Sequence, residues 1–475
     1  MLSFQDYRSH DALALAQLVR TKQVTPRELL DAATARAREV HGRINAIVVN
    51  HEELARKAIG DGLPNGPLTG VPYLLKDLGA ALKGTVTTGS LSLTKDKIAE
   101  ADSTYVERCK AAGLVIFGKT HSPELGQSPS SESRMYGATR NPWNLNHIAG
   151  GSSGGAAAAV AAGILPVAHA TDGGGSIRIP ASCCGLFGLK PTRARTPAGP
   201  KRGEGWGGAS IGHVVSRSVR DSAAFLDATA GAAPGDPYVA PLQARPFLEE
   251  IGTAPGRLRI AMSAKPPIDV PVHPDAMAAL QAAAKLCESL GHIVEEASPQ
   301  LNGMEIMAAQ GVVISANVAF AVDEAAEALG RIARPEDVER STWFRILNAR
   351  KTDSSQYARA MNTLHLVGRA VADFMAGYDV ILQPTCAQPP LSLGILDMER
   401  EDQSVMFRQM ISFIPYTGIY NLTGQPSATI PLHWNDAGLP IGTMFTTRFG
   451  DEATLFRLAA QLEQAQTWKD KFPPL

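Results

Sequence analysis

The sequence predicts an α/β protein in which a large mixed sheet is covered by helices on both faces. Three observations support this fold class. Hydrophobic residues make up 44% of the 475 residues and charged residues 19%, which is typical of a protein with a large buried core. Segments of strand character alternate with segments of helical periodicity along the chain. The 44 glycines and 32 prolines supply the tight turns that this alternation needs.

The individual elements follow from hydrophobic periodicity and turn residues. Residues 11–60 are predicted to be helical, and Thr25 with Pro26 marks a helix start, because threonine caps and proline fits the first turn. Apolar runs that end in polar residues predict buried strands. The predicted strands lie within 68–78, 114–120, 165–172, 378–385, 421–432 and 438–447, and the other predicted helices cover 103–112, 155–163 and 218–231.

We expect a single large domain that spans residues 1–475. The character of the chain changes after a stretch rich in glycine and proline at 231–241. From about 235 to 375 the sequence is dominated by helical patterns and has few loop motifs. This part is predicted to be a variable helical section, inserted in the domain, that shapes the substrate pocket.

The composition and the missing motifs exclude several classes of function. The net charge of −1 argues against a nucleic-acid binder that depends on a basic field. The sequence contains no phosphate-binding P-loop, no GxGxxG after a strand, no HExxH and no GxSxG elbow. We therefore expect neither a cofactor nor a metal ion.

The expected location is the cytoplasm. The five cysteines, an odd number in a long chain, show no spacing of a disulfide framework. Charges interrupt the N-terminal segment, which argues against a signal peptide. The apolar run at 156–168 is too short to span a membrane, which takes about 20 residues, so no membrane association is expected.

Two glycine–serine loops flank one predicted helix and one predicted strand. They are GGSSGG at 150–155 and DGGGS at 172–176, and Ser152 and Ser176 are 24 residues apart (176 − 152). One helix out and one strand back would bring both loops to the same end of the sheet. Flexible turns are the ordinary interpretation of such runs. Three glycines before a serine, however, leave backbone N–H groups uncovered, as an oxyanion hole requires, so Ser176 is a candidate nucleophile.

Lys76 is a candidate base for this serine. It ends the apolar run 71–75, where burial would disfavour the ammonium form and lower the pKa from about 10.4. Taken alone, a lysine at a strand end that pairs with Asp77 or solvent would be the simpler explanation. His121 and His169 are expected to be structural, and Cys183 and Cys184 to be small buried side chains.

These elements together resemble the amidase signature family of serine hydrolases. The resemblance spans nearly the whole chain and weakens between about 235 and 375. As a combination, the matching segments are specific. They are GVPYLLKD around Lys76, the GGSSGG loop, TDGGGSIRIPASCCGLFGLKPT at 171–192, FGKTHSPELG at 117–126, TRNPWN at 139–144, SRSVRD at 216–221 and NLTGQPSATIPL at 421–432.

The resemblance implies a catalytic triad of two serines and a lysine. Ser176 would be the nucleophile, Ser152 would relay the proton after a cis peptide bond, and Lys76 would be the terminal base. The oxyanion hole would be formed by Gly173, Gly174, Gly175 and the N–H of Ser176. Ser153 would hydrogen-bond Lys76 or the relay, and Asp172 and Arg178 would brace the nucleophile loop. Many family members carry a larger residue at 173, so glycine there is expected to loosen the loop or widen the pocket.

Within the family, the chain is most similar to the 6-aminohexanoate-cyclic-dimer hydrolase branch. Gln127 occupies a position that contacts substrate in that branch, where the residue is an asparagine. We expect further pocket walls near Trp206, 383–388 and 413–420, which offer aromatic and apolar residues and few charges. Core packing is an equally good explanation for each of these residues.

The predicted activity is hydrolysis of small, largely uncharged linear amides, such as anilides, nylon-type oligoamides or carbamates. The expected partner is the amide substrate alone, with a monomer or homodimer as the working unit. One alternative is an amidotransferase subunit of the same family that works in a complex. A catalytically inactive binding protein is a second, which the intact Lys76, Ser152 and Ser176 argue against.

Overall fold

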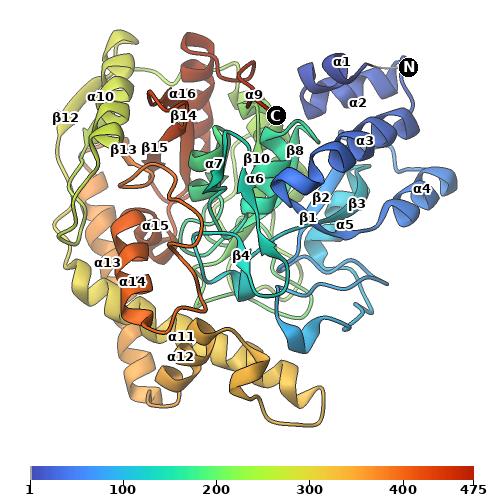
Figure 1. Ribbon diagram of the computed structural model, residues 1–475. Helices are drawn as coiled ribbons and strands as arrows, with labels where there is room; N and C mark the ends of the chain where they lie inside the picture. The colour runs from blue at the N-terminus through green and yellow to red at the C-terminus, as the bar shows by residue number, and fades with distance from the viewer. Residues whose placement is uncertain (1–2) are drawn as a thin grey trace.

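The computed structural model describes residues 3–475, and its centre is an eight-stranded mixed sheet (Figure 1). The strand order is β12-β11-β13-β15-β14-β9-β10-β8. β11 pairs in parallel with β12 and β13, and the other neighbours are antiparallel. The strands are β8 (Val167–Asp172), β9 (Phe187–Lys190), β10 (Ile211–Ser216), β11 (Arg259–Met262), β12 (Ile293–Glu296), β13 (Val380–Pro384), β14 (Ser427–Trp434) and β15 (Pro440–Thr447).

A three-stranded sheet carries the lysine of the predicted triad. Its order is β1 (Ile47–Asn50), β3 (Val115–Thr120) and β2 (Pro72–Lys76), and β2 packs beside β8 of the large sheet. Two short ladders follow β3 in the chain: β4 (Glu132–Ser133) with β5 (Gly137–Ala138), and β6 (Arg140–Asn141) with β7 (Asn144–Ile148). The packing of β2 on β8 therefore brings the ends of two separate sheets together.

Helices cover both faces of the large sheet, which confirms the predicted fold class (Figure 1). On β13, Val380 and Leu382 pack in a cluster with α8, α10 and α16, whereas Ile381 packs with α13 and α15 on the opposite face. The helices are α1 (Phe4–Ser9), α2 (Ala12–Arg20), α3 (Pro26–Ile44), α4 (Glu52–Asp61), α5 (Thr104–Ala111), α6 (Gly154–Ala161), α7 (Arg178–Cys184), α8 (Val219–Thr229), α9 (Phe247–Glu250), α10 (Pro274–Ser289), α11 (Gly303–Glu327), α12 (Arg340–Ala349), α13 (Ser354–Met375), α14 (Gln403–Phe413), α15 (Thr417–Thr423) and α16 (Glu452–Ala465).

Most predicted elements are confirmed, and three differ. Thr25 and Glu28 form a capping box at the start of α3, as the threonine–proline pair predicted. Residues 47–50 form β1 rather than helix, since they pair with β3. The section 235–375 contains β11 and β12, which extend the central sheet, besides its helices. Residues 421–423 belong to α15, so the predicted strand begins only at Ser427.

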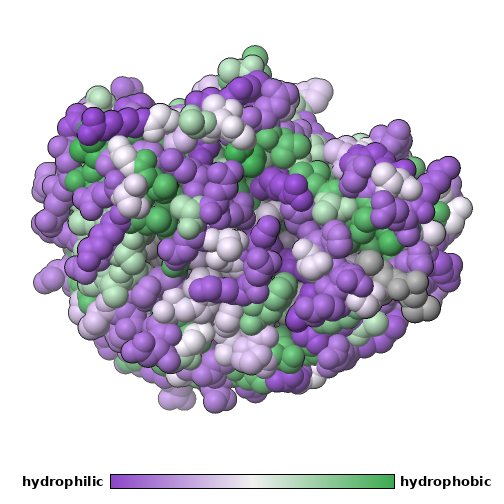
Figure 2. All heavy atoms as spheres, turned by 90° about the horizontal axis from the view of Figure 1, so that it is seen from above, coloured by the Kyte–Doolittle hydropathy of each residue, from purple (hydrophilic) through white to green (hydrophobic). Residues whose placement is uncertain are grey.

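The surface of the molecule is largely hydrophilic on the face seen from above, and hydrophobic residues gather there in small groups (Figure 2). α11 alone, in the chain from residue 3 onward, is long and apolar enough to cross a membrane by length and composition. It packs on α12 and α13. All five cysteines are buried and free.

Candidate active site

Lys76 ends β2 and is completely buried. Its Nζ donates to Ser152 Oγ at 2.7 Å and to Thr171 Oγ1 at 2.9 Å. Burial lowers the pKa of Lys76 from 10.5 to about 7, although the carboxylate of Asp172 acts in the opposite direction. Because an amine with this pKa is largely neutral in mildly alkaline solution, Lys76 can accept a proton from the hydroxyl it contacts.

Ser152 lies in the loop that leads into α6, directly after a cis peptide bond with Gly151. The side chain is buried and contacts Lys76. Ser153 does not make the hydrogen bond to Lys76 or Ser152 that we expected. Its Oγ instead donates to the Thr171 carbonyl at 3.2 Å and accepts from the Thr171 N–H at 3.3 Å. Ser153 thus fixes the backbone of the residue whose hydroxyl holds Lys76.

The loop that carries Ser176, the predicted nucleophile, connects β8 to α7 and requires glycine at two positions. A Cβ on Gly175, at φ +131°, would lie 2.4 Å from Thr417 Oγ1. A Cβ on Gly173 would lie 2.8 Å from the ring of Trp206. The indole therefore fills the space next to Gly173, and the wider pocket that we expected there does not form.

The amide groups of this loop divide into two sets. The N–H of Gly175 donates to Asp172 Oδ1 at 2.7 Å, so this amide is occupied and does not fit the predicted oxyanion hole. The N–H groups of Gly173, Gly174 and Ser176 donate to no acceptor within residues 3–475. The Gly174 carbonyl accepts from Thr417 Oγ1 at 2.6 Å, which orients the peptide unit between Gly174 and Gly175.

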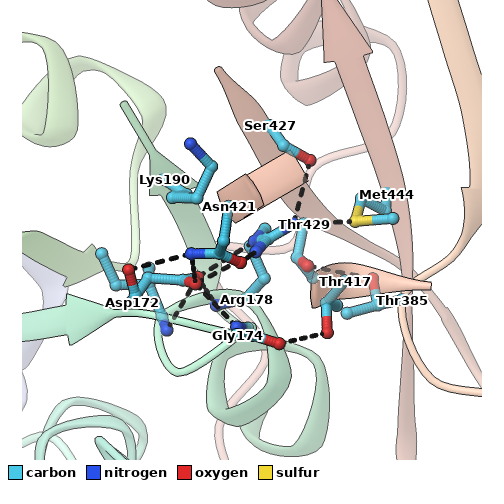
Figure 3. Close-up of polar contacts among 12 residues, drawn as sticks. Asp172, Gly174, Arg178, Lys190, Thr385, Thr417, Asn421, Ser427, Thr429 and Met444 are labelled. Atoms are coloured by element: carbon cyan, nitrogen blue, oxygen red, sulfur yellow. Dashed lines mark hydrogen bonds and ion pairs between the residues drawn. The ribbon is translucent and has the colours of Figure 1, made fainter. Parts of the chain in front are cut away.

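Asp172, Arg178 and Asn421 form a buried network beneath the loop (Figure 3). Arg178 donates to both carboxylate oxygens of Asp172 at 3.0 Å, and Asn421 Nδ2 donates to Asp172 Oδ1 at 2.8 Å. Although burial opposes it, the guanidinium of Arg178 holds the pKa of Asp172 well below its usual range. Since Asp172 Oδ1 also accepts from the Gly175 N–H, the network is bonded directly to the loop, and Asn421 is a member that the sequence did not indicate.

The histidine close to the lysine is not available as a base. His169 Nδ1 accepts from the backbone N–H of Lys76 at 3.1 Å, and burial lowers the pKa of His169 to about 3. His121 bonds Thr139 and Ser133 through its two ring nitrogens. Both histidines are therefore structural, as expected.

Two cavities meet at Ser176. The larger, of about 540 Å³, is lined mainly by apolar side chains of α11, α12, α14 and α15. The smaller, of about 220 Å³, is lined by Ser152, Thr171 and several polar residues, including Arg202 and Glu204 at its exposed side. Ser176, Gly126 and Trp206 line both cavities, so Ser176 lies where they join.

Gln127 lines the larger cavity and is held in one orientation. Its Nε2 donates to Thr342 Oγ1 at 2.7 Å, and its buried Oε1 has no hydrogen-bond partner among residues 3–475. Nε2 also donates to the backbone carbonyl of Glu124 at 3.4 Å. Both hydrogen bonds of the Gln127 amide therefore use its nitrogen, and its oxygen stays free.

The expected wall segments are partly correct. Ile414, Pro415, Gly418 and Ile419 line the larger cavity, but residues 383–388 do not. Gln383 instead accepts from Tyr420 in the core. No sequence pattern predicted that four further residues lie at or beneath the site. They are Thr171, Thr417, Asn421 and Arg345.

Comparison with known proteins gives one consistent family. The family model described as Amidase matches residues 28–456. A 6-aminohexanoate-cyclic-dimer hydrolase from Paenarthrobacter ureafaciens is 37% identical, over 98% of this chain and 96% of that protein. The structure of a 6-aminohexanoate cyclic dimer hydrolase with substrate superimposes with a TM-score of 0.94 at 35% identity, over 98% of this chain and 99% of the other. A bacterial aryl acylamidase gives a TM-score of 0.87 at 27% identity, over 97% and 96% of the two chains.

Proposed function

The chain belongs to the amidase family, enzymes that hydrolyse carbon–nitrogen bonds other than peptide bonds, and we propose that it cleaves linear amides with Ser176 as the nucleophile. The observation that carries this proposal is the buried Lys76, whose Nζ lies 2.7 Å from Oγ of Ser152, a residue that lines the smaller cavity together with Ser176. A serine hydroxyl attacks an amide only when a base removes its proton. Here the base would be Lys76, and Ser152 would connect it to Ser176.

The acylation step would proceed as follows. Neutral Lys76 takes the proton of Ser152, and Ser152 takes the proton of Ser176 as Ser176 Oγ attacks the carbonyl carbon. The negative charge that develops on the carbonyl oxygen is stabilised by N–H groups of the nucleophile loop. We assign this role to Gly173, Gly174 and Ser176, because Asp172 already accepts from the Gly175 N–H.

The relay then returns the proton to the leaving nitrogen. Since Ser152 lines the smaller cavity, the leaving amine would lie there and the acyl group would extend into the larger cavity. Water would attack the acyl-enzyme from the side that the amine vacates, with the same lysine as base. No step in this scheme needs a metal ion or an organic cofactor.

The walls of the larger cavity favour acyl groups with an apolar body. Anilides, nylon-type oligoamides and carbamates with such a body all pass through a tetrahedral intermediate that this loop could stabilise. Gln127 would accept a hydrogen bond from an N–H of the substrate through its unpartnered Oε1. Trp206 would line the junction of the two cavities, against the scissile bond.

The test is hydrolysis of a small neutral anilide by the purified chain alone. The chain should release the aromatic amine, and the Ser176→Ala variant, with unchanged thermal unfolding, should not. If the wild-type chain releases no amine from any member of a panel of anilides, aliphatic amides, oligoamides and carbamates, the proposal fails, and an amidotransferase subunit that needs partners becomes the better explanation. The mass of the chain in solution would decide between the expected monomer and homodimer.

A further inference from the structure

Arg345 is the one charged residue that lines the larger cavity, among residues 3–475. It lies on α12, and only 8% of its surface is exposed. The ring of Phe407 on α14 stacks against the guanidinium, with its centroid 5.0 Å from Cζ. The rest of the wall around it is apolar or uncharged, with Phe344, Asn348 and Met410 nearby in the lining.

The guanidinium of Arg345 has no partner within the described part of the chain. Its Nε is buried and makes no hydrogen bond, and no carboxylate pairs with it. Burial lowers the pKa of Arg345 from 12.5 to about 10, and no acidic side chain opposes this effect. Buried charges in proteins are normally paired, because an unpaired charge loses its hydration without compensation.

The two neighbouring arginines differ from Arg345, because each of them faces a carboxylate. Arg340 and Arg350 lie at the two ends of the same helix, are exposed, and face Glu399 at 3.8 Å and Asp323 at 2.7 Å. Stacking on Phe407 also does not satisfy Arg345, because it uses the face of the guanidinium and leaves the N–H groups in its plane free. The N–H groups of Arg345 can therefore bind an anion that enters the cavity.

We propose that Arg345 binds a carboxylate carried by the acyl part of the substrate. This inference rests on the proposed function, which places the acyl group in the larger cavity. The planar guanidinium presents a pair of N–H donors that match the two oxygens of a carboxylate. Asn348, one turn further along α12, lines the same cavity and adds a third donor. The substrate would then be an amide of a dicarboxylic acid: an apolar chain with the scissile amide at one end and a free carboxylate at the other.

A substrate with a free carboxylate differs from the largely uncharged amide that the sequence led us to expect. An uncharged substrate accounts for the apolar wall but leaves the Arg345 charge buried and unpaired in the complex. A carboxylate-terminated acyl chain satisfies both features, since its methylene groups meet the apolar wall and its charge meets the guanidinium.

The test compares two anilides that differ only at the far end of the acyl chain. One is the mono-anilide of a linear dicarboxylic acid, and the other has a methyl group in place of the free carboxylate. Several chain lengths are measured, and a third anilide of the methyl series carries a carboxylate on the aromatic amine. In the wild-type chain, kcat/KM for the acid should exceed that for its methyl counterpart by roughly ten- to a hundredfold at the best chain length.

The variants assign the preference to one residue. Arg345→Gln should bring the acid-to-methyl ratio close to 1, whereas Arg350→Gln, the exposed and paired control on the same helix, should leave the ratio as it is in the wild type. A wild-type ratio near 1 at every chain length would overturn the inference. So would a ratio that survives in Arg345→Gln, or a preference that appears only when the carboxylate is on the amine.

A binding measurement separates this inference from the proposed function. A linear dicarboxylic acid, as product analogue, should raise the melting temperature of the wild-type chain and of Arg350→Gln, and a monocarboxylic acid of equal length with no second carboxylate should raise it less. Arg345→Met should lose this difference. If the dicarboxylate stabilises Arg345→Met as much as the wild type, the inference is wrong, whether or not any amide is cleaved. If the neutral anilide is cleaved but the ratio is 1, the proposed function stands without it.

Discussion

Raising the pH from 6 to 8 should increase kcat/KM for a neutral anilide about tenfold, because Lys76 acts only as the neutral amine. Burial lowers the pKa of Lys76 to about 7. With this pKa, about one molecule in eleven carries the neutral amine at pH 6 and about ten in eleven at pH 8. At the ordinary lysine pKa of about 10.4, only about one molecule in 2,500 would be neutral at pH 7.

The assay is the pH dependence of kcat/KM between pH 5 and 9, measured in parallel with a matched activated aryl ester. Lys76→Met should lose about 10²- to 10⁴-fold in anilide hydrolysis and less in ester hydrolysis, because a phenolate leaves without a proton. Lys190→Met is the matched control, since Lys190 is also buried with a pKa lowered to about 7 but lines neither cavity. A wild-type profile that is flat across this range, or that still rises tenfold per unit between pH 8 and 9, would refute the reasoning. A shift of the midpoint of the pH–rate profile in Lys190→Met would also refute it, because the midpoint should depend on Lys76.

The same shift predicts how stability depends on pH. In the folded chain Lys76 loses its proton near pH 7, whereas in the unfolded chain it keeps the proton up to about pH 10.5. The unfolded chain therefore binds one more proton in this window, and this group makes the free energy of unfolding rise with pH, by about 1.4 kcal/mol per unit. Below pH 7 Lys76 is protonated in both the folded and the unfolded chain, so the free energy of unfolding is reduced by the full cost of burying the ammonium. Lys76→Met should thus stabilise the chain more at pH 6 than at pH 10, as chemical unfolding at the two pH values would measure.

Three further variants test the residues around the lysine. Ser152→Ala should give a kcat/KM for the anilide between that of Lys76→Met and that of the wild type, because water can replace part of the relay. A loss of kcat/KM larger than that of Ser176→Ala would contradict this role. Thr171→Val removes an acceptor 2.9 Å from Lys76 Nζ that favours the ammonium, so the midpoint of the pH–rate profile should move to lower pH, and a move to higher pH would be inconsistent. Asp172→Asn leaves the buried Arg178 without its carboxylate and should cost about 3–5 kcal/mol in urea unfolding, whereas a loss below about 1 kcal/mol would show that the ion pair is not needed.

The sequence was most informative where a local pattern carries the function. Lys76 was recognised because a charged residue ends an apolar strand, and Ser176 because three glycines precede it. The strands at 115–120 and 380–384 followed from continuous apolar runs, which the structure buries on both faces. The short strands β11 and β12 were missed because four-residue strands beside long alanine-rich helices give little periodicity.

The partners of these residues could not be predicted, because they come from distant parts of the chain. Asn421 lies 249 residues from Asp172, and only the packing of α15 against the end of β8 brings them together. Thr171 is one of many threonines in strands and has no signal of its own. Arg345 lies in an ordinary helical pattern, and its burial depends on how α12 packs against α14. The expectation of an uncharged substrate rested on composition, which does not show that one arginine lies inside the cavity.

The central claim is that Ser176 forms the acyl-enzyme, and covalent labelling tests it most directly. The chain is incubated with an activated aryl ester whose acyl group is hydrolysed slowly from serine, such as a carbamate, and the intact mass and the modified peptide are then measured. The account predicts one added acyl group, located on Ser176, and no adduct on Ser176→Ala. An adduct located on Ser152, Ser153 or Cys183, or labelling that persists in Ser176→Ala, would contradict it.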